Sequence, residues 1–164
     1  MLHQLSNPLL EYFYKGAMEI KIREVVANDY TEVVFLWNDV LGVRNVNIEN
    51  FRVTMENMNK AGNYKTFVAL FENEVVGFVT IVQALSVGSS NGYLHIQGLA
   101  VKKELQHSGI GTELLRHTEN YAKEMGISSI ILCSGFKRID AHAFYVHNGY
   151  DKDSYCFDKI IKLD

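Results

Sequence analysis

The feature that most constrains the fold is a strand that leads through a glycine turn into a helix, in the segment LHIQGLAVKKELQHSGIGTELLRHTENYA. The β-rich stretch ends at Val101, and Gly109 and Gly111 stand where the helix begins. Each glycine costs a helix about 1 kcal/mol relative to alanine. The start of a helix offers unpaired N–H groups and partial positive charge, so it binds phosphate when no side chain blocks the approach. A tight strand-to-helix connection is the alternative explanation.

Hydrophobic periodicity along the rest of the chain predicts the order β-α-α-β-β-β-α-β-α-β, which indicates a mixed sheet with helices on both faces. The predicted strands span residues 18–25, 64–71, 75–84, 93–101, 127–133 and 155–163, and the predicted helices span 29–41, 48–60, 109–125 and 139–147. We expect Asn28 and Asn47 to cap the first two helices, and residues 88–92 to form a loop. The apolar run 127–133 is typical of a strand buried on both faces.

Composition limits the class of protein. The chain has 164 residues, of which 48% are hydrophobic and 21% are charged, as in one folded domain. We expect residues 1–17 to be an N-terminal extension and residues 18–164 to be the domain. The formal charge of −3 argues against a nucleic-acid partner, and no apolar stretch is long enough to span a membrane. Cys133 and Cys156 are predicted to be reduced thiols in or near the core of a cytoplasmic protein, with no metal site.

Two sequence elements together resemble the GNAT superfamily of N-acetyltransferases. The first is Gln106-x-x-Gly109-x-Gly111 after Leu99-Ala100-Val101, which resembles the family's coenzyme A pyrophosphate loop. The second is Arg138-x-x-Ala141-His142-x-Phe144-Tyr145-x-x-x-Gly149-Tyr150, which resembles the signature in the helix after the fifth strand. The glycine spacing fits neither GxGxxG nor the P-loop, so an enzyme that uses NAD or ATP is disfavoured.

The resemblance implies an α/β (α+β) fold with a mixed, mostly antiparallel sheet of 6–7 strands, about 4 helices, and a splay between the fourth and fifth strands. Acetyl-CoA would enter that splay as cosubstrate. Its pantetheine would pair with the backbone of the fourth strand at Leu99, Ala100 and Val101, next to a bulge at Gly98. Its pyrophosphate would bind the turn made of Gln106, His107, Ser108, Gly109, Ile110 and Gly111.

The resemblance also implies that Tyr145 is the general acid that protonates the departing thiolate. Arg138 stands where many members carry asparagine, and it is expected to pair with a coenzyme A phosphate or with Asp140. A general base is harder to find, because Gln97 stands where some members have glutamate. His95 is the candidate base, although a lone strand histidine is more often structural.

The resulting prediction is an N-acetyltransferase that moves an acetyl group from acetyl-CoA to a primary amine of a small molecule or peptide. The amine would attack the thioester directly in a ternary complex. The alternative is a catalytically silent sensor or interaction module that binds acyl-CoA. A homodimer paired through the final strand, residues 155–163, is a further expectation.

Overall fold

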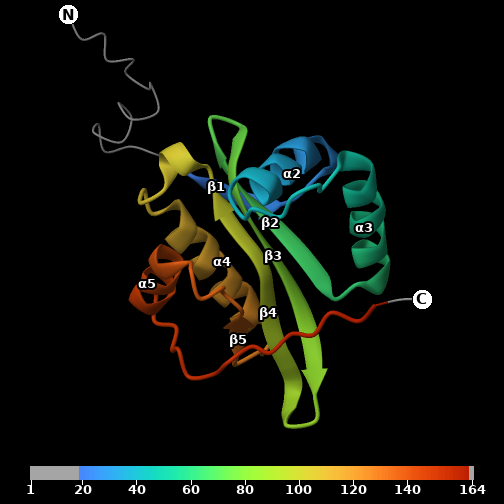
Figure 1. Ribbon diagram of the computed structural model, residues 1–164, viewed down its shortest axis with the longest axis vertical. Helices are drawn as coiled ribbons and strands as arrows, with labels where there is room; N and C mark the ends of the chain where they lie inside the picture. Colours follow the sequence, from blue (N-terminus) through green and yellow to red (C-terminus); the bar gives the residue numbers. More distant parts are fainter. Residues whose placement is uncertain (1–18, 163–164) are drawn as a thin grey trace, which may run out of the picture. The chain divides into compact units, whose positions relative to one another are not determined.

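The computed structural model describes residues 19–162, so the predicted extension 1–17 lies outside the described residues (Figure 1). The chain divides into two compact units between Ile131 and Leu132, and each unit is described by itself. The assignment of 18–164 to a single domain stays a prediction. No helix within residues 19–162 is long and apolar enough to cross a bilayer.

The first unit holds a sheet and three α-helices. Its strands are β1 (Lys21–Glu24), β2 (Tyr64–Phe71), β3 (Glu74–Ser86) and β4 (Ser89–Val101), and its α-helices are α2 (Tyr30–Asp39), α3 (Ile48–Ala61) and α4 (Ile110–Glu124). Two short 3-10 helices, η1 (Ala27–Asp29) and η2 (Lys103–Leu105), precede α2 and α4. Strand β5 (Ile130–Leu132) crosses the boundary between the units, and helix α5 (Ile139–His147) belongs to the second unit.

The sheet has the order β1-β2-β3-β4-β5, and the pairs β1–β2, β2–β3 and β3–β4 are antiparallel. This confirms the mixed fold with a mostly antiparallel sheet. The described residues form five strands rather than the predicted 6–7. The splay between β4 and β5 stays a prediction.

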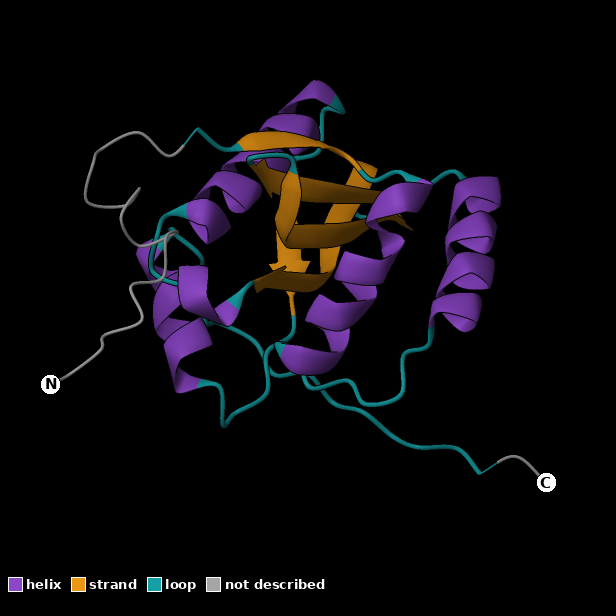
Figure 2. Ribbon diagram, turned by 90° about the horizontal axis from the view of Figure 1, so that it is seen from above, coloured by secondary structure: helices purple, strands orange, loops and turns teal. Residues whose placement is uncertain are grey.

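Helices cover both faces of the sheet in the first unit, with α2 and α3 on one face and α4 on the other (Figures 1 and 2). Successive strand residues point to opposite faces, so neighbouring residues of β2 join different cores. Val68 packs in one cluster with Val33 and Leu36 of α2. Phe67, one residue earlier, stacks edge-on against His117 and Tyr121 of α4.

Helix α3 begins and ends as its sequence predicts. The Asn47 side chain accepts a hydrogen bond from the Asn50 amide at 2.9 Å, and Gly62 adopts a left-handed φ of 76° just after the helix. An asparagine cap and a terminal glycine satisfy backbone groups that a helix leaves unpaired at its ends.

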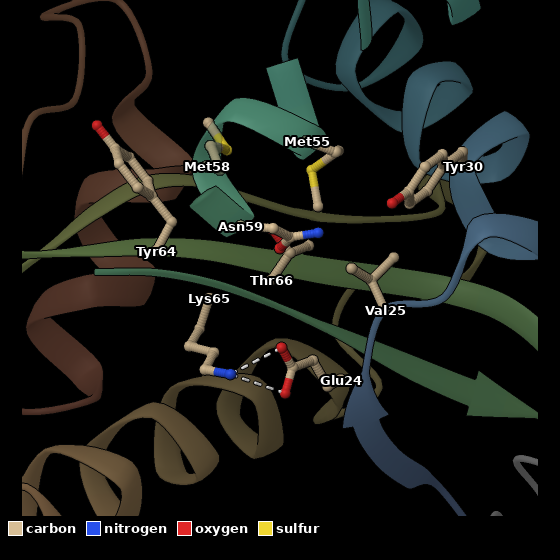
Figure 3. A pocket seen from close by; sticks show the side chains of 9 residues that line it. All are labelled: Glu24, Val25, Tyr30, Met55, Met58, Asn59, Tyr64, Lys65 and Thr66. Atoms are coloured by element: carbon tan, nitrogen blue, oxygen red, sulfur yellow. Dashed lines mark hydrogen bonds and ion pairs between the residues drawn. The ribbon is translucent and has the colours of Figure 1, made fainter. Parts of the chain in front are cut away.

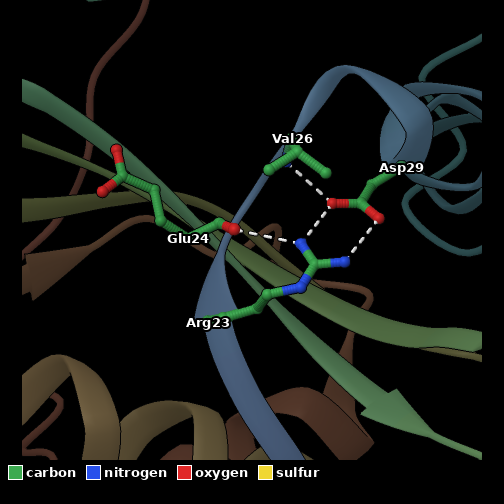
Figure 4. A network of polar contacts seen from close by, with 4 residues as sticks. All are labelled: Arg23, Glu24, Val26 and Asp29. Atoms are coloured by element: carbon green, nitrogen blue, oxygen red, sulfur yellow. Dashed lines mark hydrogen bonds and ion pairs between the residues drawn. The ribbon is translucent and has the colours of Figure 1, made fainter. Parts of the chain in front are cut away.

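The predicted N-cap of α2 at Asn28 is wrong. The helix begins at Tyr30, and the polar group at its entrance is Asp29, whose carboxylate accepts from the Val26 amide at 2.8 Å (Figure 4). The Arg23 guanidinium donates to both carboxylate oxygens, at 2.6 and 2.9 Å. Burial alone would raise the pKa of Asp29, but the Arg23 and Val26 hydrogen bonds outweigh it and hold this pKa below its usual value. The ion pair and the Val26 hydrogen bond therefore hold the Asp29 carboxylate just before α2.

Three further predictions about the strands are wrong. Gly88 of the expected loop 88–92 lies in a turn, but residues 89–92 belong to β4, which pairs back on β3. The expected doubly buried strand 127–133 shortens to β5, in which Ile131 is 43% exposed. Residues 155–162 of the predicted final strand form no strand, and Phe157 is 92% exposed. Apolar alternation makes a strand only where a neighbouring backbone pairs with it.

The expectation of core cysteines is also wrong, because Cys133 and Cys156 are both exposed. The pKa of Cys133 is raised by its interaction with the Cys156 side chain and by partial burial. Hydrophobic context in the sequence predicted burial, whereas β5 is too short to carry Cys133 into the core.

Candidate functional site

Strand β4 carries a bulge at the position where the sequence predicts one. Thr80 pairs with Gly98, while the next residue of β3, Ile81, pairs with Ile96, so Gln97 is an extra residue on β4. A bulge of this kind leaves backbone groups outside the regular ladder and redirects the strand. The backbone of Leu99–Val101 follows directly after it.

The bulge also decides which residues share a face of β4. His95 pairs with Val82 and Gly98 pairs with Thr80, and these two partners lie two residues apart on β3. His95 and Gly98 therefore share a face although they are three residues apart. Ala100, opposite Phe78, lies on the same face, which is the one covered by α2 and α3. His95 is half-buried and Gln97 is exposed.

The turn between β4 and α4 is held by hydrogen bonds of its own side chains. The Gln106 side-chain amide donates to the Val101 carbonyl at 3.3 Å, and the Ser108 hydroxyl donates to the Leu105 carbonyl at 2.5 Å. His107 adopts a left-handed φ of 64°, a conformation that is uncommon outside glycine. These contacts fix the path of the turn before any ligand arrives.

Gly109 opens the start of α4. It is the N-cap residue, it has a φ of 87°, and no side chain caps the first turn. A Cβ built on Gly109 would meet no atom within 4 Å, so the space where a side chain would lie is open. The Glu113 amide already bonds to the Gly109 carbonyl at 3.0 Å, which leaves the earlier amides of the first turn without an intrahelical partner.

A hollow of about 470 Å³ lies at this helix start. It is lined by Ile20, Ser108, Gly109, Ile110, Thr112 and Glu113. The space adjoins the unpaired amides and the positive end of the helix dipole, which is the arrangement that binds phosphate groups. The turn's predicted residues Ser108, Gly109 and Ile110 thus line one hollow in the first unit.

Two lysines that precede the turn are engaged with acidic residues. Lys102 Nζ lies 3.7 Å from a carboxylate oxygen of Glu32 and 3.9 Å from one of Glu74. Lys103 Nζ lies 3.0 Å from Asp39. These pairs tie the end of β4 to α2 and to β3, and they neutralise the lysine charges beside the turn.

The second unit contains Tyr145, the predicted general acid, on α5. Its ring packs edge-on against Phe144 and Tyr150, with centroids 5.2 and 5.8 Å away. Gly149 follows the helix with a φ of 84°, and the Tyr150 amide bonds to the Tyr145 carbonyl at 3.0 Å. Gly149 and Tyr150 therefore have the structural role that their positions predict.

Burial raises the pKa of Tyr145 above its ordinary value, and the nearby positive charge of Arg138 lowers it by less. The phenol is accordingly protonated at neutral pH, as a general acid must be before it acts. Arg138 is the N-cap residue of α5, and it forms no ion pair with Asp140 within the described residues.

Another hollow, of about 70 Å³, lies between the end of α3 and the strands β1 and β2 (Figure 3). It is lined by Glu24, Val25, Tyr30, Met55, Met58, Asn59, Tyr64, Lys65 and Thr66. None of the predicted site residues belongs to it. Lys65 and Glu24 form an ion pair at its rim, at 2.8 Å.

One contact at the bulge, between Trp37 and Gly98, is not apparent from the sequence. The indole of Trp37 lies directly over Gly98, where a Cβ would come within 2.5 Å of the ring. The sequence shows Trp37 only as one member of an apolar stripe at helical spacing. The pairing of α2 with this part of β4 depends on tertiary structure.

Comparison with known proteins identifies a family whose model spans both the glycine turn and the α5 motif. The model of the acetyltransferase (GNAT) family matches residues 27–150, which is most of the chain. The aminoalkylphosphonate N-acetyltransferase of Salmonella typhimurium is 32% identical over 94 residues. That match covers 57% of this chain and 61% of the Salmonella protein, so the chain spans less than two thirds of that relative.

Solved structures show the same fold. A transcriptional regulator from Bacillus halodurans C-125 superposes with a TM-score of 0.79 at 23% identity, over 87% of this chain and 100% of that one. An aminoglycoside acetyltransferase from an uncultured soil metagenomic sample superposes with a TM-score of 0.76 at 24% identity, over 87% of this chain and 97% of that one.

Proposed function

The chain belongs to the acetyltransferase (GNAT) family, and from this premise we propose that it transfers an acetyl group from acetyl-CoA to a primary amine. The observation that carries the proposal is the open start of α4. There the turn residues, an N-cap without a side chain and a hollow of about 470 Å³ coincide. A pyrophosphate would accept hydrogen bonds from amides between His107 and Gly111, since the Gln106 amide already donates to the Lys103 carbonyl at 3.3 Å, and its charge suits the helix dipole.

The end of β4 would bind the remainder of the cosubstrate. After the bulge, the backbone of Leu99, Ala100 and Val101 would pair with the pantetheine as an added strand does. A backbone N–H in this stretch would donate to the thioester oxygen and stabilise the charge that develops on it. Arg138 would supply a cation for a coenzyme A phosphate.

The reaction would proceed by direct attack in a ternary complex. The amine nitrogen forms a bond to the thioester carbon, and the C–S bond breaks as the tetrahedral intermediate collapses. Tyr145 gives its phenolic proton to the leaving thiolate, and its raised pKa keeps that proton in place until then. The amine gives up a proton to a base, and His95, half-buried on the face of β4 beneath α2, is the residue we propose for it.

A small-molecule amine is the acceptor class that the relatives favour. The Salmonella relative is named for an aminoalkylphosphonate, and one structural neighbour is an aminoglycoside acetyltransferase. A peptide amine stays a candidate because the fold alone does not fix the acceptor.

The test is a calorimetric titration of the full chain with acetyl-CoA, with NAD as the control ligand. We expect acetyl-CoA to bind at micromolar concentration and NAD to give no heat. Release of free thiol on adding a panel of small amines and short peptides would then show transfer. Absence of acetyl-CoA binding to a folded sample free of coenzyme A would disprove the proposal.

The alternative, a silent sensor of acyl-CoA, makes a different prediction for Tyr145→Phe. In an enzyme this variant retains acetyl-CoA binding and loses roughly 100-fold or more in kcat, the usual range for a removed general acid. In a sensor the wild type itself releases no thiol with any amine. Because the Tyr145 pKa is raised, the loss of rate from ionisation of this phenol should come at a higher pH than for an ordinary tyrosine.

A further inference from the structure

The bulge of β4 lacks a side chain of its own at Gly98, and a residue of α2 fills the space. A Cβ on Gly98 would lie 2.5 Å from Trp37 Cη2, 2.7 Å from Trp37 Cζ2 and 3.2 Å from Leu41 Cδ1. Real Cβ atoms do not approach a ring this closely, so the indole can occupy this position only if residue 98 is a glycine. The glycine is buried, which means that the indole is its cover.

The indole also packs on the neighbouring strand β3, on the same face of the sheet. The rings of Trp37 and Phe78 lie 5.3 Å apart with an interplanar angle of 37°. Phe78 is fully buried and pairs with Ala100, two residues beyond Gly98 on β4. Trp37 is therefore wedged against the same short stretch of β4 on which the acetyl carbonyl is proposed to bind.

A bulge needs such a support because it interrupts the regular ladder. Gln97 has no partner in the register between β3 and β4, so packing must fix the backbone that the ladder does not. The amide of Leu99 comes directly after the packed glycine. A donor that stabilises a transition state is effective only while its position is fixed, because loss of fixed geometry lowers the rate more than the affinity.

We propose that Trp37 is a positioning residue for acetyl transfer: its indole holds the β4 bulge at Gly98 and so fixes the backbone amide of Leu99. The inference rests on the proposed function, since it assigns that amide to the thioester oxygen. Trp37 itself touches neither substrate in this account. It acts through the backbone of β4, and it ties the helix α2 to the reacting centre.

The test compares Trp37→Phe with Tyr30→Leu. Phenylalanine lacks the outer ring atoms that reach Gly98, so we expect kcat to fall about tenfold while KM for acetyl-CoA changes less than about twofold. Tyr30 lies on the same helix but packs on Phe51, with ring centroids 5.3 Å apart. Tyr30→Leu should lower the melting temperature and leave kcat unchanged. A wild-type kcat in Trp37→Phe would overturn the inference.

A double variant tests whether the two positions act through one contact. Gly98→Ala alone should lower kcat at least about tenfold, because the new methyl group displaces the bulge. In the Trp37→Phe background the methyl group has room, so Gly98→Ala should cost little further. Independent losses that multiply to about 100-fold would contradict a shared contact.

Backbone NMR separates this inference from the proposed function. In the free protein, Trp37→Phe should speed hydrogen exchange of the Gly98 and Leu99 amides, while Tyr30→Leu should not. If the wild type transfers no acetyl group, the proposed function fails whatever these exchange rates are. If the wild type is active and the exchange rates are unchanged in Trp37→Phe, the positioning role fails alone.

Discussion

The first turns of α3 and α4 lie in the same unit, and their unpaired backbone amides are treated in opposite ways. At α3, the side chain of Asn47 accepts a hydrogen bond from the Asn50 amide. At α4, the cap residue is Gly109, which offers no side chain and leaves a hollow beside the first turn. The first arrangement satisfies the helix from within, whereas the second leaves its amides for a partner from outside.

The difference indicates that the start of α4 forgoes a stabilising cap bond and keeps its amides accessible to a ligand. A glycine with a φ of 87° at a helix start contributes no cap bond, although it is only a few tenths of a kcal/mol less favourable there than an asparagine or serine. The turn before it is nevertheless fixed, by the Gln106 and Ser108 hydrogen bonds. A turn that is rigid but uncapped is expected at a ligand site and unexpected at a mere connection.

The largest effect should come from closing the open start with a charge. Gly109→Glu places a carboxylate beside the amides proposed to bind pyrophosphate, and we expect acetyl-CoA affinity to fall at least about 100-fold, since charged hydrogen bonds are the strong ones. Calorimetry measures the change.

Gly62→Glu is the matched control for that variant. Gly62 has a similar φ of 76°, and a Cβ there also meets nothing within 4 Å. The backbone strain is therefore alike, while no ligand is proposed at the end of α3. Equal losses of affinity in the two variants would show that strain, rather than blocked amides, weakens binding.

The start of α2 shows a third arrangement, in which an ion pair rather than an asparagine side chain lies at the helix entrance. Asp29→Asn should lower the free energy of unfolding by about 2 kcal/mol at pH 7, because Asp29 is nearly buried and Arg23 loses its partner. Urea unfolding measures this. Acetyl-CoA affinity should not change.

The pH dependence of unfolding sharpens that prediction. The folded-state pKa of Asp29 is lowered, so its contribution is complete above the unfolded value of about 3.9 and is lost as the pH falls through the folded value. The gap between wild type and Asp29→Asn should therefore close in strong acid. A gap that persists unchanged at pH 2 would contradict the sign of the shift.

Opening the closed start of α3 should have a smaller effect, confined to stability. Asn47→Ala removes the cap bond and should cost about 1 kcal/mol, whereas Asn47→Gly should cost only a few tenths. Thermal unfolding distinguishes the two. Neither variant should change acetyl-CoA affinity, and a gain of binding at the opened α3 start would show that an open helix end alone suffices.

The smallest expected effect comes from loosening the turn without touching the open amides. Ser108→Ala removes the hydroxyl that donates to the Leu105 carbonyl at 2.5 Å. We expect acetyl-CoA affinity to fall roughly threefold, which is within the net worth of one neutral hydrogen bond. Thr112→Ser keeps a hydroxyl in the lining of the same hollow and serves as the conservative control.

Much of the fold could be predicted from the sequence because local chemistry decides it. The bounds of β2 and α5 match their predictions residue for residue, and α3 extends its prediction by one residue. Capping or turn residues such as Asn47, Gly62 and Gly149 mark the ends of these segments. The family model confirms the resemblance that two short motifs suggested.

The misplaced elements have physical causes of different kinds. The predicted final strand fails because residues 155–162 lack a strand partner, and no local pattern reveals whether one is present. The predicted cap at Asn28 is wrong because Asn28 lies inside the 3-10 helix Ala27–Asp29 that precedes α2. The first outcome depends on a strand partner that the local sequence does not contain.

The sequence by itself determined the order of the elements up to α5 and the glycine at the start of α4, since hydrophobic periodicity and the conformational freedom of glycine are local properties. Only the tertiary structure decided that Trp37 covers Gly98, that His95 shares a face with it, and that Cys133 is exposed. These outcomes depend on register and packing between distant segments, which no local pattern specifies.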